Sequence, residues 1–148
     1  MEHWAVEPEV LKMYAKHYKT GDVIPQTLVD KIIKAGKFNQ GFITTEFLAA
    51  AILDMDYSTV TKAGDIDVEK FEKTSMEKAG LIPEIIPRYR STYFNHVFPG
   101  GYSSGYYSYI WAAVLDCDAF EAYLEKGNIF DQDVATSFRK NVLERGGT

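Results

Sequence analysis

The residues best suited to chemistry lie close together, in the stretch HVFPGGYSSGYYSY at positions 96–109. It contains one imidazole, His96, and four of the chain's ten tyrosines. Phenols are hydrogen-bond donors that stay neutral near pH 7, and an imidazole can donate or accept a hydrogen bond there. A convergent set of such groups suits the backbone of an extended peptide or a developing oxyanion.

The spacing of the tyrosines brings several of them together. Tyr106 and Tyr109 are three residues apart and share one face of a predicted helix, while Tyr102 projects from the loop before it. Glycine lets that loop bend and approach a ligand closely, at positions Gly100, Gly101 and Gly105. These residues and His96 form the candidate binding site.

Two ligand classes fit this stretch poorly. Gly100 and Gly105 have the spacing of a phosphate-binding loop, but two tyrosines follow where Lys and Ser or Thr are required. A platform that stacks nucleic-acid bases needs basic residues among its aromatics, and the nearest are Arg88 and Arg90. A nucleotide or nucleic acid is therefore not the expected ligand.

A plainer interpretation remains open, in which the tyrosines pack at a helix N-terminus against a neighbouring helix. We expect this packing role for Tyr107 and Trp111. A lone histidine is also more often a structural residue than a functional one, so the residue types alone leave both interpretations of His96 available.

Composition excludes further classes. The chain has 148 residues and a net charge of −5, which argues against a phosphate-backbone partner, and no apolar run approaches the length that spans a bilayer. The single cysteine, Cys117, allows no internal disulfide. No HExxH or CxxC occurs, and the histidines His3, His17 and His96 lack zinc-ligand spacing, so we expect no metal ligands in this chain.

The hydrophobic periodicity is helical nearly throughout and predicts one all-α domain of about six helices over residues 1–148. The first helix starts at Pro8 and runs past Tyr18, and an additional short helix is expected over residues 88–94. The remaining predicted starts are Pro25, the caps Thr44 and Thr45, the cap Asp67, Ser104 and the cap Asp131.

For two of these helices the sequence also predicts which residues are buried. The LAAAIL centre of the third is apolar all round and is predicted to be buried. The long helix from Ser104 to Lys126 places Cys117 on its apolar face, which gives weak support for a reducing compartment.

The segment FNHVFPGGYSSGYYSYIWAAVLDCDAF resembles the C-terminal catalytic region of the M3 zinc metallopeptidases, the thimet oligopeptidase and peptidyl-dipeptidase group. Two further segments, EHWAVEPEVLKMYAKHYKTGDVIPQTLVDKI and FNQGFITTEFLAAAILDMDY, resemble the Dcp-type peptidyl-dipeptidase branch. The resemblance covers nearly the whole chain. It implies a helical portion of a larger catalytic domain that hydrolyses short peptides near their C-terminus.

The resemblance also implies what each site residue does. His96 and Tyr109 correspond to catalytic contacts with the transition state, and Tyr102 and Tyr106 to substrate contacts. The loop glycines Gly100, Gly101 and Gly105 correspond to a segment that closes over substrate. Relatives often have His where this chain has Ser58, after Tyr57, and we infer no loss of catalysis from that departure.

In the M3 family an HExxH motif and a later glutamate hold zinc, and this sequence begins just after the expected position of that glutamate. Glu2 is not that ligand. We therefore expect zinc in the full-length enzyme but none in this chain, which would be inactive alone. The expected partners are short peptides, the rest of the parent enzyme and, through exposed apolar surface, other copies of the chain.

The parent enzyme is expected in the cytoplasm, with the periplasm not excluded, because the missing N-terminus would carry any signal peptide. The loop from Pro99 to Ser104 is expected to be more mobile than the helices beside it. The alternative function, from a different class, is a stand-alone helical peptide-binding module without catalysis.

Overall fold

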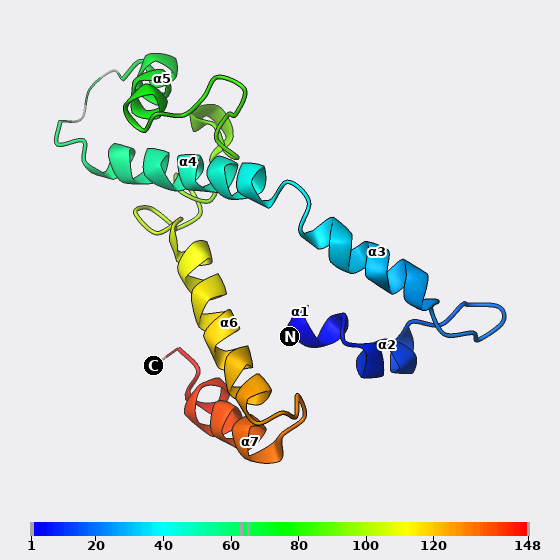
Figure 1. Cartoon of the computed structure of the whole chain (residues 1–148). Helices are drawn as coiled ribbons and strands as arrows, with labels where there is room; N and C mark the ends of the chain where they lie inside the picture. The colour runs from blue at the N-terminus through cyan, green and yellow to red at the C-terminus, as the bar shows by residue number, and fades with distance from the viewer. Residues whose placement is uncertain (1, 63, 65, 148) are drawn as a thin grey trace. The chain divides into compact units, whose positions relative to one another are not determined.

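The computed structural model describes residues 2–62, 64 and 66–147 (Figure 1). These residues form seven α-helices and two short 3-10 helices, with an isolated β-bridge between Lys16 and Val23, so the all-α prediction is confirmed. The ends of the predicted domain, Met1 and Thr148, lie outside the described residues. Among those described, no helix combines the length and apolar character needed to cross a bilayer.

The chain groups into two compact units, one of Met1–Phe38 with Ala112–Thr148 and the other of Asn39–Trp111. Helix α6 (Ser108–Glu125) begins in the second unit and ends in the first. The assignment of residues 1–148 to a single domain therefore stays a prediction.

The unit Asn39–Trp111 is built on two helices, α4 (Gln40–Ser58) and α5 (Val68–Lys78), which pack on each other (Figure 1). A 3-10 helix, η1 (Ser91–Tyr93), packs on α5. The core between α4 and α5 contains Leu53 and Met76.

The LAAAIL segment of α4 is buried on one side only. Ala49, Ala50 and Ala51 are buried, whereas Leu48 and Ile52 are exposed. The prediction of burial all round is therefore wrong for part of this segment, because α5 and the chain after it cover only one side of α4.

The predicted helix caps have different outcomes. Asp67 accepts a hydrogen bond from Lys70 N at 3.0 Å, and Asp131 accepts from the backbone at the start of α7 (Gln132–Asn141), so both caps are confirmed. The cap at Thr44 or Thr45 is wrong, since α4 already begins at Gln40. Thr45 lies inside the helix and donates its hydroxyl to Gly41 O at 2.8 Å.

The unit Met1–Phe38 with Ala112–Thr148 anchors the N-terminal residues on α6. Trp4 packs edge-on against Phe120 and Tyr123 and donates its indole N–H to Ile129 O at 2.7 Å. His3 stacks on Phe120 with a centroid separation of 4.6 Å. The other elements of this unit are α1 (Glu2–Ala5), α2 (Pro8–Tyr14), α3 (Gln26–Gly36), α7 and η2 (Leu143–Arg145).

Several boundaries and exposures correct the sequence expectations. Helix α2 ends at Tyr14, and Tyr18 is exposed in the turn closed by the Lys16–Val23 bridge. Cys117 is exposed, so it does not lie on a core face. Tyr107 and Trp111 are also exposed on α6 or just before it, so their expected packing against a neighbouring helix is not found.

Candidate functional site: a tyrosine cluster around a buried imidazole nitrogen

The site lies where the chain returns to α4 after η1. Phe94, Val97 and Tyr106 are buried against Ala50 and Ala51 of α4. These contacts fix both ends of the loop between His96 and α6. The structure thus brings the predicted site residues of this loop to one place in the unit Asn39–Trp111.

His96 is enclosed by aromatic rings. Its ring centroid lies 4.7 Å from that of Tyr89, 5.6 Å from Tyr106, 6.1 Å from Tyr102 and 6.2 Å from Tyr109. Its Nδ1 is buried and has no hydrogen-bond partner within the described part of the chain. A buried polar atom without a partner is costly, so this nitrogen is placed to take a partner from a ligand.

Tyr102 and Tyr109 form an accessible phenol pair beside His96. They remain 42% and 41% exposed, and their rings stack with a centroid separation of 5.6 Å and an interplanar angle of 19°. The side-chain hydrogen bond with Tyr102 raises the pKa of Tyr109 above its ordinary value, with a smaller effect of burial. Tyr109 is therefore a neutral phenol near neutral pH, and its proton can pass from Tyr102 to a stronger acceptor such as an oxyanion.

Tyr106 differs from its two neighbours because it is almost completely buried, at 2% exposure. Its ring stacks on Phe47 at 4.8 Å, and burial raises its pKa to about 12. The structure thus places Tyr106 in the packed base of the cluster. Its role as a substrate contact stays a prediction.

The loop glycines meet two different backbone requirements. A side chain at Gly100 would lie 2.5 Å from the carbonyl oxygen of Asn95 and 2.7 Å from that of His96, so the chain crosses itself too closely for a Cβ. Gly101 has φ +83°, a conformation that other residues rarely adopt. Gly105 has a milder constraint, with a potential Cβ 3.2 Å from Tyr102 O.

Asp54 is a site residue that the sequence reasoning missed. It is 0% exposed, near the C-terminal end of α4, and each carboxylate oxygen accepts a backbone N–H from the loop. Oδ1 lies 2.9 Å from Ser104 N, and Oδ2 lies 3.0 Å from Tyr106 N. An acidic residue directly after the apolar LAAAIL segment was the available signal, because a buried carboxylate needs hydrogen-bond donors.

These bonds bear on the expected mobility of the loop. Tyr102 N donates to His96 O at 3.0 Å, and Ser103 Oγ donates to Val97 O at 2.8 Å. Together with Asp54, they tie the second half of the loop to its first half and to α4. Any excess mobility is therefore expected at Gly100 and Gly101, while the mobility prediction for the whole loop remains untested.

A second buried carboxylate holds the chain upstream of the site. Glu72 on α5 accepts hydrogen bonds from Arg90 Nε at 2.6 Å and from the backbone N and Oγ of Ser91 at 2.8 and 2.9 Å. Tyr57 donates to the same Ser91 hydroxyl at 2.7 Å. Burial alone would raise the pKa of Glu72, but the hydrogen bonds from Ser91 and Arg90 outweigh it and lower the pKa.

The described residues do not fit a zinc ion. No group of three His, Cys, Asp or Glu side chains placed to hold a metal occurs among residues 2–62, 64 and 66–147. His96 is surrounded by aromatic rings, whereas a zinc site needs three or four ligand side chains.

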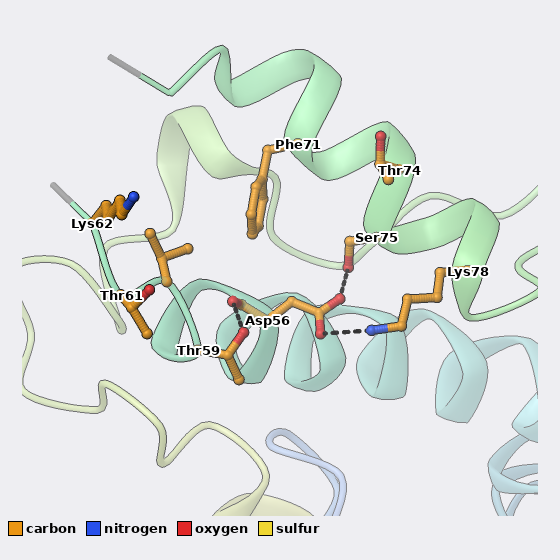
Figure 2. A pocket seen from close by; sticks show the side chains of 9 residues that line it. Asp56, Thr59, Thr61, Lys62, Phe71, Thr74, Ser75 and Lys78 are labelled. Carbon is orange, nitrogen blue, oxygen red and sulfur yellow. Dashed lines mark hydrogen bonds and ion pairs between the residues drawn. The ribbon is translucent and has the colours of Figure 1, made fainter. Parts of the chain in front are cut away.

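A separate hollow of about 450 Å³ lies between α4 and α5 (Figure 2). Its lining includes Asp56, which accepts a hydrogen bond from Ser75 Oγ at 2.7 Å and lies 3.8 Å from Lys78 Nζ. None of the predicted site residues lines this hollow. The Asp56 carboxylate already has partners on α5, so we interpret the hollow as part of the packing between the two helices and not as a ligand site.

Comparison with known proteins covers the whole chain. Residues 1–148 match the model of Peptidase family M3. The chain is 38% identical to the dipeptidyl carboxypeptidase of Escherichia coli (strain K12) over 149 residues, covering 99% of this chain and 22% of that protein. It is 35% identical to oligopeptidase A of the same strain over 153 residues, covering 100% of this chain and 22% of that protein.

A more distant relative is saccharolysin of Saccharomyces cerevisiae (strain ATCC 204508 / S288c), 28% identical over 150 residues, with 99% of this chain and 21% of that protein covered. The chain thus spans about a fifth of the length of these relatives. The family model covers every residue of the chain. The resemblance seen in the sequence is therefore confirmed, and the chain belongs to peptidase family M3.

Proposed function

We propose that residues 96–109 form the substrate-binding and oxyanion-stabilising wall of a peptidase active site that other parts of a longer enzyme complete. The enzyme is of the peptidyl-dipeptidase type and hydrolyses short peptides near their C-terminus. The similarity to a dipeptidyl carboxypeptidase over nearly the whole chain supports this choice of substrate.

One observation carries the proposal: two accessible phenols, Tyr102 and Tyr109, lie beside a buried imidazole nitrogen that has no partner in the described chain. When water adds to a peptide carbonyl carbon, the carbonyl oxygen takes the electron pair and becomes an oxyanion. A neutral phenol that donates a hydrogen bond to this oxygen stabilises the transition state more than the ground state.

Each residue then has a distinct role. Tyr109 donates to the developing oxyanion, and Tyr102 holds the Tyr109 hydroxyl and contacts the peptide backbone. His96 orients the peptide through its free ring nitrogen. The zinc that the family implies would be held by other residues of the longer enzyme and would activate the attacking water, while Tyr109, Tyr102 and His96 act on the peptide.

The test is the substitution Tyr109→Phe in the complete, zinc-loaded enzyme that carries these residues. It removes one hydroxyl and keeps the ring, so kcat on a short peptide is expected to fall by roughly 10²–10³, about 3–4 kcal/mol of barrier. KM should change far less, because the charge develops only in the transition state.

Tyr107→Phe is the matched control, since Tyr107 is also exposed and lies two residues away. We expect it to keep kcat within about threefold of the wild type. A Tyr109→Phe enzyme with equally normal kcat would refute the catalytic role. An assembled protein that binds peptide, loses affinity in Tyr109→Phe and never turns over would instead favour the stand-alone peptide-binding module.

A further inference from the structure

Asp54 combines features that packing alone does not require. It lies near the C-terminal end of α4, it is completely buried, and the described structure gives its two oxygens partners from the backbone, Ser104 N and Tyr106 N. A buried carboxylate is costly unless donors satisfy it, so these two bonds are needed wherever Asp54 remains charged. The sequence resemblance assigns Asp54 no role.

The two amides that Asp54 holds lie next to the two accessible phenols. Ser104 is two residues after Tyr102, and Tyr106 is three residues before Tyr109. Tyr109 N donates to Tyr106 O at 3.4 Å, so one turn of chain connects the held amide to Tyr109. A displacement of either amide would therefore move one ring of the Tyr102–Tyr109 pair.

The conformation of Ser104 strengthens this interpretation. Its φ is +58°, in the left-handed region that a residue with a side chain seldom adopts. Such a conformation persists only where the surroundings hold it in place. The hydrogen bond from Ser104 N to Asp54 Oδ1, at 2.9 Å, ties this backbone turn to α4, beside the bond from Gly105 N to Tyr102 O that closes the turn itself.

We propose that Asp54 is a positioning residue that sets the separation and stacking of Tyr102 and Tyr109 by holding the amides of Ser104 and Tyr106. It does not touch the peptide. That the positioned phenols act on a peptide rests on the proposed function, whereas the positioning itself does not.

The first measurement needs no variant. Amide hydrogen exchange of the 148-residue chain should show Ser104 and Tyr106 exchanging at least about tenfold more slowly than Gly101. Equal exchange at the three amides would overturn the proposal.

The second measurement compares Asp54→Asn with Glu72→Gln. Both changes keep side-chain shape and remove a buried carboxylate from the same unit, but Glu72 holds Ser91 and not the tyrosine loop. Asp54→Asn should lose the nuclear Overhauser contacts between the rings of Tyr102 and Tyr109, and the pKa of Tyr109 should fall toward its ordinary value. Glu72→Gln should lower the stability of the fold but keep the Tyr102–Tyr109 ring contacts and the raised pKa of Tyr109.

If Asp54→Asn does not fold, the double variant Asp54→Asn/Ser104→Gly provides the test, because glycine adopts the positive φ without cost. A folded single or double variant that keeps the ring contacts would overturn the proposal, and failure of both to fold would also count against a role limited to positioning.

A kinetic arm separates this proposal from the proposed function. Lost ring contacts with unchanged kcat in the complete enzyme would uphold the positioning and refute the catalytic role. Retained ring contacts in Asp54→Asn would refute the positioning whatever the value of kcat, and the catalytic role would then rest on Tyr109→Phe.

Discussion

Glu72 gives the sharpest prediction about stability, because its partners are defined atom by atom. The substitution Glu72→Gln keeps the side-chain volume but removes the charge and turns one acceptor into an NH2 group. That group would face a donor, either Arg90 Nε or the Ser91 backbone N–H. In the wild type both contacts are short: Arg90 Nε lies 2.6 Å from Glu72 Oε1, and Ser91 N lies 2.8 Å from Glu72 Oε2.

The expected cost follows from the burial of each partner. Removing one member of a fully buried ion pair costs about 3–5 kcal/mol. The Arg90 side chain is 46% exposed, so water can solvate its guanidinium after the change. The remaining loss is one charge-assisted bond to the Ser91 backbone and a weakened bond to its hydroxyl, which we place at about 2–3 kcal/mol.

The effect should depend on pH in a defined direction. Because the folded pKa of Glu72 lies below its unfolded value of 4.5, its contribution to stability is fully present above that pH and is lost as pH falls through the folded pKa. Urea unfolding of the 148-residue chain at pH 7 and at pH 3 measures both points. The difference in free energy of unfolding between the wild type and Glu72→Gln should be smaller at pH 3 than at pH 7, because Glu72 is then largely protonated in the unfolded chain.

Glu77→Gln is the control, because its pairing with Lys73 spans 3.8 Å between exposed side chains. It should cost less than about 0.5 kcal/mol at either pH. If Glu72→Gln lowered the free energy of unfolding no more than the control does, Glu72 would not stabilise the fold as argued. A destabilisation by Glu72→Gln that grows on acidification would refute the lowered pKa.

Two further predictions concern the loop and the metal. Gly100→Ala should destabilise the chain by about 1–3 kcal/mol in urea unfolding, since its Cβ would meet backbone oxygens at 2.5 and 2.7 Å, whereas Gly41→Ala, with open space around it inside α4, should be neutral or stabilising by up to about 1 kcal/mol. The 148-residue chain after chelator washing should hold no stoichiometric zinc by elemental analysis, and one tightly bound zinc per chain would contradict this.

Local signals in the sequence predicted local structure well. The all-α class follows from periodicity, and the caps Asp67 and Asp131 follow from the preference of carboxylates for the first turn of a helix. Thr44 and Thr45 were wrong as caps because a threonine inside a helix can donate to the preceding turn, as Thr45 does. That choice depends on whether the residues before them become helical, which composition does not decide.

The site itself depends on contacts between residues that are distant in sequence. Spacing grouped Tyr102, Tyr106 and Tyr109, but it could not show that Tyr106 is buried under Phe47 while the other two stay exposed. Asp54 was missed for the same reason, since its partners are 50 and 52 residues away. Periodicity describes one helix at a time and contains no information about what covers it.

The two carboxylates also imply an order of events during folding. The Glu72–Ser91 bond closes 19 residues of chain, whereas the Asp54–Ser104 bond closes 50. By loop-closure entropy the longer closure costs about 1 kcal/mol more if it occurs first. We therefore expect the tyrosine loop to dock on α4 after Ser91 has docked on α5. Its bonds would then be absent from the folding transition state, and changes at Asp54 should accelerate unfolding while leaving the folding rate nearly unchanged.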